Sequence, residues 1–197
     1  MLISFMPNSS NMVKSMESHG KKKVLFLCMH NSARSQMAEG LLRAIYGDRY
    51  EAYSAGVETT TINPNAIAVM KEIGIDISSQ HSKTSQEFQD TIFDLAITVC
   101  DRAKVACPIC STNLELPTQF PRAREVIHES FEDPAAAVGS EEEKLKVFRQ
   151  VRDEIKDWIS QNLGNDASIL FLIFFDRFHN ARSTYFLILF RQPCNLS

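Results

Sequence analysis

Residues 24–46 constrain the fold more than any other part of this chain. An apolar run, residues 24–27, ends at Cys28, and a polar loop then leads into a segment that begins at Arg34. The run is typical of a buried strand, and the apolar residues of the segment after the loop repeat at helical spacing. A strand, a short loop and a helix in this order predict an α/β fold with Cys28 at the carboxyl end of a strand.

The loop after Cys28 has the features of an anion-binding site. Cys28 and Arg34 are separated by five residues, which are Met29, His30, Asn31, Ser32 and Ala33. Ser35 follows Arg34 directly. Backbone N–H groups and the positive end of a helix converge at such a loop, and a guanidinium group binds two oxyanion oxygens at once. The same field is expected to lower the pKa of the Cys28 thiol and make it a nucleophile. If only the spacing is considered, the alternative is that Cys28 serves as a small buried apolar residue.

Residues 21–163 alternate between strand-like and helix-like segments. Strands are predicted at residues 24–27, 50–53, 93–99 and 125–127. Helices are predicted at residues 34–46, between an Asn63-Pro64 start and Gly74, and after the Ser140/Glu143 capping box. We therefore expect one α/β domain, built on a small open parallel four-stranded sheet with helices on both faces.

The two ends of the chain differ from this domain. Residues 1–20 are rich in Ser and Asn and are predicted to be disordered, without a secretory leader. Residues 164–197 form an atypical extension with two apolar runs, 169–175 and 185–190. Each run is far shorter than the about 20 apolar residues of a membrane helix, so no membrane span is expected. We interpret this tail as an accessory segment or a shifted-frame extension.

Charge and cysteine usage narrow the function classes. With a net charge of −3, the chain lacks the excess of basic residues that is typical of proteins that bind nucleic acid. The odd number of cysteines, five, and the lack of a leader predict a reducing cytoplasm, where thiols are more often chemical than structural.

Three further thiols accompany Cys28 in the predicted domain. Cys100 ends the strand at residues 93–99 as Cys28 ends its own. If the two strands are neighbours, their ends lie about 4.8 Å apart, and a modest loop movement brings the thiols to disulfide distance. Cys107 follows after six residues and forms a C-x-x-C pair with Cys110. A zinc site is disfavoured because no second pair completes four ligands, so Cys110 is either a spare resolving thiol or a bystander.

A family resemblance joins these features. Residues 28–39 resemble the low-molecular-weight protein tyrosine phosphatase superfamily, and within it the arsenate reductase branch. The resemblance continues through residues 53–56, Asn63-Pro64, residues 75–78 and residues 133–135, and covers about residues 22–163.

The resemblance implies a relay of cysteines. The thiolate of Cys28 would attack arsenate while Arg34 balances its charge; Cys100 and then Cys107 would resolve the intermediate, and thioredoxin would reduce the final disulfide. Phosphate and sulfate are expected to bind as analogues of arsenate. Asp133 matches the general acid of the family, whereas the plain alternative for Asp133-Pro134 is a turn.

Three differences from the phosphatases favour the reductase. Residues 135–137 are alanines where phosphatases carry aromatic residues, Gln36 replaces a proline, and Cys100 and Cys107 are both present. The alternative function is a phosphatase that hydrolyses phosphate monoesters through a Cys28 phosphoenzyme. A non-enzymatic redox or arsenic sensor would require that Cys28 be dispensable.

The resemblance also implies a potassium site and supporting residues. Four positions match a potassium site of some relatives: Asn31, Glu39, Ser54 and Asp76. Glu39 is equally well explained as an exposed helix residue, and no tightly bound cofactor is expected. His128 and Glu129 stand where reductases often show His-Trp. Asp101 is expected to face solvent.

Overall fold

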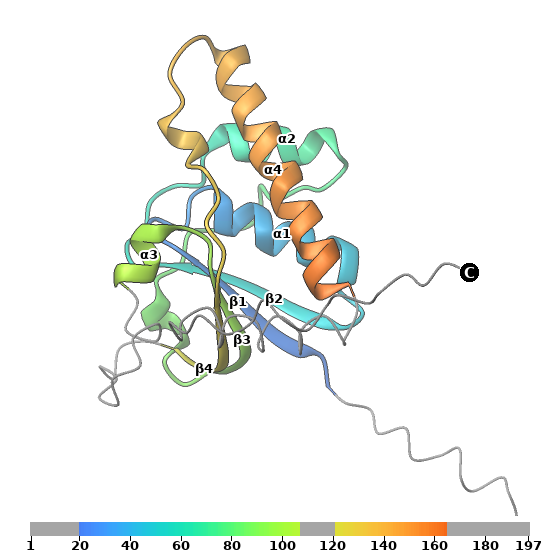
Figure 1. Cartoon of the computed structure of the whole chain (residues 1–197), viewed down its shortest axis with the longest axis vertical. Helices are drawn as coiled ribbons and strands as arrows, with labels where there is room; N and C mark the ends of the chain where they lie inside the picture. Colours follow the sequence, from blue (N-terminus) through green and yellow to red (C-terminus); the bar gives the residue numbers. More distant parts are fainter. Residues whose placement is uncertain (1–19, 107–120, 165–197) are drawn as a thin grey trace, which may run out of the picture.

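Four parallel strands form the sheet of this computed structural model, which describes residues 20–106 and 121–164 (Figure 1). The strands are β1 (Lys22–Cys28), β2 (Tyr50–Gly56), β3 (Ile92–Thr98) and β4 (Arg122–His128). Their spatial order is β2-β1-β3-β4, with every neighbouring pair parallel. The predicted open parallel sheet is therefore confirmed, and β2 and β4 are each longer than their apolar cores suggested.

The helices begin where the sequence places their caps. The structure contains α1 (Arg34–Tyr46), α2 (Pro64–Glu72), α3 (Asp101–Ala106) and α4 (Glu141–Leu163), with 3₁₀ turns η2 (Ser85–Phe88) and η4 (Pro134–Ala136). The Asn63 side chain accepts the backbone N–H of Asn65 at 2.9 Å, and Ser140 and Glu143 form the predicted capping box. These bonds satisfy N–H groups that a helix start leaves without partners.

The central position of β1 explains its apolar run. β1 lies between β2 and β3, and its last five residues are buried. A strand with packed layers on both faces must be apolar on both, unlike the alternating pattern of a half-exposed strand. In register, Cys28 pairs with Gly56 of β2, and Leu27 pairs with Thr98 of β3. The carboxyl ends of three strands thus meet around Cys28.

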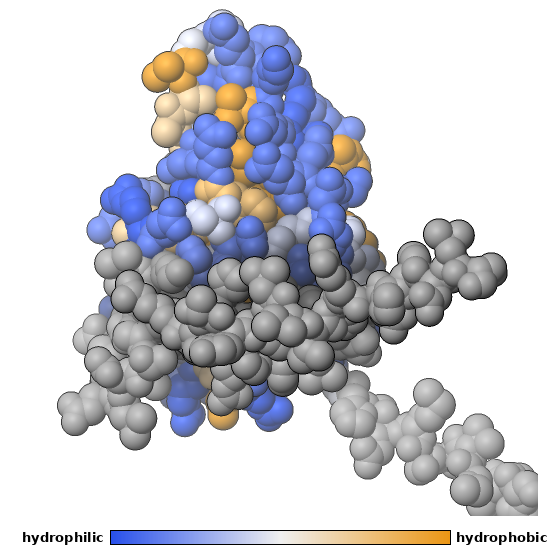
Figure 2. Space-filling model, in the orientation of Figure 1, coloured by the Kyte–Doolittle hydropathy of each residue, from blue (hydrophilic) through white to orange (hydrophobic). Residues whose placement is uncertain are grey.

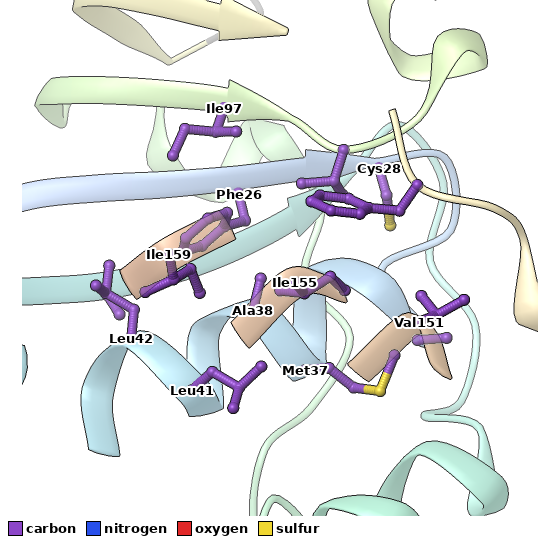
Figure 3. Packing of buried hydrophobic residues seen from close by; sticks show 14 of the residues in the cluster. Phe26, Cys28, Met37, Ala38, Leu41, Leu42, Ile97, Val151, Ile155 and Ile159 are labelled. Carbon is purple, nitrogen blue, oxygen red and sulfur yellow. The ribbon is translucent and has the colours of Figure 1, made fainter. Parts of the chain in front are cut away.

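The main core lies between the sheet and the long helices. Phe26 and Cys28 point from β1 toward α1, on the side where Ile155 and Ile159 of α4 pack (Figure 3). Each fully buried large apolar side chain contributes about 1.5–3 kcal/mol of transfer free energy. Hydrophilic side chains cover much of the outer surface of this helical layer (Figure 2). On the opposite face of the sheet, the rings of Tyr53, Phe88 and Phe93 pack edge to face.

Some predictions concern residues beyond the described ranges. The extensions at residues 1–19 and 165–197, and both Cys107 and Cys110, lie outside the described residues. Within residues 20–106 and 121–164, no helix is long and apolar enough to cross a membrane.

Candidate active site

The Cys28 thiol sits inside a loop that turns its N–H groups inward. The backbone N–H of Asn31 lies 3.1 Å from the Cys28 sulfur, and the backbone N–H of Ser35, in the first turn of α1, also bonds this sulfur. Asn31 has a φ of 48°, a left-handed conformation that asparagine tolerates better than most residues. The turn at Asn31 and the start of α1 direct these two N–H groups at the sulfur, and anion binding by this loop stays a prediction.

The carbonyl groups of the loop are bonded away from Cys28. The carbonyl of Met29 accepts the N–H of Glu58, that of His30 accepts the Ser82 hydroxyl, and that of Ser32 accepts the N–H of Asn63, at 2.9, 3.0 and 2.9 Å. Ala33 is the N-cap of α1 without a side-chain bond of its own. The carbonyl oxygens of Met29, His30 and Ser32 thus have partners other than the Cys28 thiol, whereas two N–H groups of the loop and helix start bond the sulfur.

The His30 ring lies on the outer side of the loop. Its Nε2 is 3.6 Å from a carboxylate oxygen of exposed Glu58. The ring of His30 therefore has its partner at the surface of the protein.

A line of hydrogen bonds leads from Gln36 to the Cys28 sulfur. Gln36 Nε2 donates to Asn31 Oδ1 at 2.9 Å and to the carbonyl of His81 at 2.9 Å. Asn31 Nδ2 donates to Ser35 Oγ at 2.8 Å, and Ser35 Oγ lies 2.9 Å from the Cys28 sulfur in a hydrogen bond in which either group can be the donor. Sequence analysis treated Gln36 only as a difference from the phosphatases, whereas the structure gives it a positioning role. Only the tertiary structure reveals its partner His81, which is 45 residues away.

Burial raises the pKa of the Cys28 thiol. The side chain is 4% exposed, and removal from water disfavours the thiolate; the nearby Cys100 adds to this effect. The bonds from Ser35 and Asn31 favour the thiolate but do not outweigh burial. The predicted lowering of the pKa is therefore wrong for this conformation, in which burial raises the pKa of Cys28.

The guanidinium group of Arg34 is paired with Asp133. Arg34 Nη2 lies 3.1 Å from Asp133 Oδ2, and Arg34 Nη1 donates to the carbonyl of Phe131 at 3.0 Å. Asp133 Oδ1 also accepts the N–H of Ala135 at 3.2 Å and caps η4. Asp133 is thus both a turn residue, as the plain alternative held, and a neighbour of Arg34, the residue predicted to bind the oxyanion. An oxyanion that binds Arg34 competes with this carboxylate.

Cys100 lies beside Cys28, as the strand order requires. β1 and β3 are neighbours, which confirms the condition on which the predicted approach of the two thiols rested. Cys100 is 3% exposed, and its sulfur accepts the N–H of Ala103 at 3.3 Å in the first turn of α3. Both cysteines are free thiols. Cys100 lies close enough to Cys28 to raise the pKa of the Cys28 thiol.

Gly56 is a site residue that sequence analysis named only within a longer motif. A Cβ atom at this position would lie 2.9 Å from the Asn31 nitrogen, 2.9 Å from the Met29 carbonyl oxygen and closer still to the carbonyl oxygen of Glu58. Because these contacts are with backbone atoms, no side chain can rotate away to make room. Only glycine lets β2 approach the loop this closely.

The four residues of the predicted potassium site have other partners. Glu39 is buried, not exposed; its carboxylate accepts the Ser54 hydroxyl at 2.5 Å, lies 3.2 Å from Lys83 Nζ, and contacts Arg43. The backbone N–H of Lys83 donates to Asn31 Oδ1 at 2.8 Å.

Asp76 lies in an exposed loop, where its carboxylate accepts the N–H of Ser78 at 2.8 Å and its pKa is lowered by that bonding. These contacts do not fit an added monovalent cation, because two basic side chains already neutralise Glu39. A potassium site stays a prediction, and the ammonium group of Lys83 stands beside Glu39 instead. Among residues 20–106 and 121–164, no cluster of three or more His, Cys, Asp or Glu side chains could hold a metal ion.

Comparison with known families and proteins supports the resemblance. Residues 23–168 match the family described as low molecular weight phosphotyrosine protein phosphatase. An arsenate reductase of Halalkalibacterium halodurans is 47% identical over 135 residues, which are 68% of this chain and 90% of that protein. An arsenate reductase of Bacillus subtilis is 45% identical over 134 residues, 68% of this chain and 89% of that protein.

Solved structures show the same fold. A structure described as an arsenate reductase in the phosphate binding state superposes with a TM-score of 0.53 at 35% identity and covers 71% of this chain and 94% of that one. A low molecular weight protein tyrosine phosphatase from T. tengcongensis gives a TM-score of 0.56 at 26% identity, with 71% and 96% covered.

Proposed function

The chain belongs to the low molecular weight phosphotyrosine protein phosphatase family, and we propose that within it the protein is an arsenate reductase that works through a cysteine relay. The observation that carries this proposal is the pair of buried free thiols, Cys28 and Cys100, at the ends of adjoining strands beside Arg34. A phosphatase needs Cys28 but has no use for a second thiol at this place.

In the first step, arsenate binds in the loop and displaces Asp133 from Arg34. The Cys28 sulfur bonds to arsenic and one oxygen of arsenate leaves as water. The proton of the Cys28 thiol must reach the leaving oxygen, and we assign its transfer to the Asp133 carboxylate once that group is released from Arg34. The N–H groups of the loop and Arg34 stabilise the charge that remains on the oxyanion.

In the second step, the Cys100 sulfur attacks the Cys28 sulfur. A Cys28–Cys100 disulfide forms, the thiol proton of Cys100 passes to an oxygen of the arsenic group, and the electron pair of the sulfur–arsenic bond stays on arsenic, which leaves as arsenite. Arsenic(V) is thereby reduced to arsenic(III) and the two thiols are oxidised to one disulfide. The Ser35 hydroxyl favours Cys28 as a thiolate, which suits it as a leaving group in the next exchange.

In the third step, Cys107 attacks Cys100 and releases Cys28 as a thiol. The Cys100–Cys107 disulfide is then reduced by the dithiol of thioredoxin, which completes the cycle. The free thiols Cys28 and Cys100 suit a reducing cytoplasm, where we place the reaction.

Mass spectrometry of disulfides after one arsenate turnover without reductant tests the relay. A Cys100–Cys107 disulfide is expected; Cys100–Cys110 or Cys107–Cys110 would assign the last step to Cys110. Cys100→Ser and Cys107→Ser should each abolish multiple turnover with thioredoxin while leaving hydrolysis of an aryl phosphate in place, since that reaction needs only Cys28, Arg34 and Asp133.

Full arsenate turnover by the Cys100→Ser variant would overturn the proposal. Strong phosphotyrosine hydrolysis without any arsenate-dependent disulfide would instead support the phosphatase alternative.

A further inference from the structure

His128 links the two sides of Cys100. Its Nδ1 lies 2.8 Å from the hydroxyl of Thr98, the last residue of β3, and its Nε2 lies 3.1 Å from the carboxylate of Asp101, the first residue of α3. Thr98 stands two residues before Cys100 and Asp101 one residue after it. One imidazole ring on β4 therefore holds the chain both before and after this thiol.

The register of the sheet places His128 for this role. Thr98 and His128 are paired across β3 and β4, and Thr98 is fully buried while the His128 side chain is 18% exposed. The Thr98 hydroxyl also lies 3.4 Å from the carbonyl of Ile127. The bond between His128 and Thr98 thus lies within the sheet, whereas the bond between His128 and Asp101 lies at the surface. Asp101 is exposed, as predicted.

The relay requires α3 to change shape. Cys100 and Cys107 are seven positions apart, and α3 occupies the six residues between them. A helix rises 1.5 Å per residue, so seven residues of continuous helix would separate two Cα atoms by about 10 Å, whereas a disulfide needs about 4.4–6.8 Å. The Cys100–Cys107 bond therefore requires α3 to unwind or bend, starting from the turn that Asp101 and Ala103 close on Cys100.

We propose that His128 is a positioning residue for Cys100: by holding Thr98 and Asp101, it keeps the first turn of α3 closed, so that Cys100 reacts with Cys28 before it reacts with Cys107. The effect on disulfide order rests on the proposed relay, whereas the hold on α3 does not. The loss of both hydrogen bonds should shift the equilibrium between closed and opened α3 by roughly tenfold.

Hydrogen exchange of the reduced protein tests the hold on α3 without any oxidation. His128→Ala should raise exchange of the amides of residues 101–106 by about tenfold, with little change in the amides of β1. Asp101→Asn, which weakens the bond between Asp101 and His128, should give a smaller rise in amide exchange. It also serves as a second test of the proposal if His128→Ala fails to fold. Glu125→Ala, an exposed substitution on the same strand, is the matched control.

Controlled oxidation tests the disulfide order. Diamide takes two hydrogens from a thiol pair, so quenched samples reveal by mass spectrometry which disulfide forms first. The early ratio of Cys100–Cys107 to Cys28–Cys100 should rise by about fivefold in His128→Ala and return toward the original value in His128→Gln, whose amide can bond at one end.

The two readouts separate the possible failures. Unchanged exchange at residues 101–106 in both His128→Ala and Asp101→Asn would overturn the role of His128 whatever the relay does. Increased exchange with no Cys100–Cys107 disulfide in any variant would contradict the relay and leave the hold on α3 standing. An equal loss of protection throughout β1 and α3 would show that His128 supports the whole fold, and would also overturn the inference.

Discussion

The Ser35 hydroxyl, in the first turn of α1, lies 2.9 Å from the sulfur of Cys28, the last residue of β1. The Ser35 oxygen also accepts the Asn31 amide at 2.8 Å, and when Cys28 is a thiolate the Ser35 hydroxyl can only donate to it. This bond works against the burial that raises the pKa of Cys28. The balance of these two effects sets the reactivity of the proposed nucleophile.

Ser35→Ala should slow alkylation of Cys28 by iodoacetamide at pH 7. A hydrogen bond to a charged group contributes about 1.5–3 kcal/mol, so loss of this one should reduce the thiolate fraction, and with it the rate, by about tenfold or more. Peptide mapping identifies the alkylated cysteine. Ser160→Ala, which removes a hydroxyl from α4, is the control, and an equal effect of both substitutions would contradict the role of Ser35.

The raised pKa of Cys28 predicts a loss of stability at high pH. The unfolded thiol loses its proton near its ordinary pKa of 9.0, whereas the folded thiol keeps it to higher pH. The contribution to stability is present below pH 9.0 and is lost as the pH rises through the folded pKa. Urea unfolding between pH 8 and 10.5 should show a steeper fall in the free energy of unfolding than in Cys28→Ser. Parallel curves would contradict the raised pKa.

Asp133→Asn should separate binding from catalysis. Without the carboxylate, Arg34 is free to meet an oxyanion, so calorimetry should show phosphate binding tighter by about two- to fivefold, as expected for a partly exposed ion pair. The kcat for aryl phosphate hydrolysis should fall by about 10²–10⁴, because the group that transfers the proton is lost. Weaker phosphate binding would show that Asp133 supports the loop rather than competing for Arg34.

Gly56→Ala should distort the anion-binding loop. The added methyl group would meet backbone atoms of Met29, Asn31 and Glu58, and overpacking of this kind costs about 1–3 kcal/mol of stability. We expect a lower melting temperature and phosphate affinity reduced by at least tenfold. Gly20→Ala is the matched control, since a Cβ atom there meets nothing within 4 Å. Unchanged phosphate affinity in Gly56→Ala would show that the loop tolerates the displacement.

Lys83→Met should destabilise the protein and make its melting temperature depend on the alkali cation present. The Lys83 ammonium group pairs with Glu39, and both side chains are largely buried. Breaking a buried pair costs about 3–5 kcal/mol, and because Arg43 still contacts Glu39 we expect about 1–3 kcal/mol here. The melting temperature of Lys83→Met should rise in KCl relative to NaCl, whereas the original protein should not distinguish the two salts. A clear potassium effect on the original protein would restore the predicted potassium site.

Local sequence signals were sufficient for most of the fold. The apolar run at residues 24–27, the Asn63-Pro64 start and the Ser140/Glu143 capping box each act through neighbours a few positions away, and the structure confirms all three. Trp158 is half-buried rather than fully buried, although it lies at the helical spacing of Val151 and Ile155 on α4. Spacing predicts the face of a helix, whereas the shape of the opposing surface decides how deeply each member of that face is buried.

The sequence was enough to predict the groups that are proposed to carry the chemistry: Cys28 at a strand end, Arg34 at a helix start, and Cys100 at a second strand end. Their electrostatic state depends on the tertiary structure, because burial, pairing and proximity involve segments far apart in the chain. Burial raises the pKa of Cys28 against the field of its loop, and Lys83 approaches Glu39 across 44 residues. Desolvation and ion pairing act over a few ångströms of space, and no spacing along the chain encodes those distances.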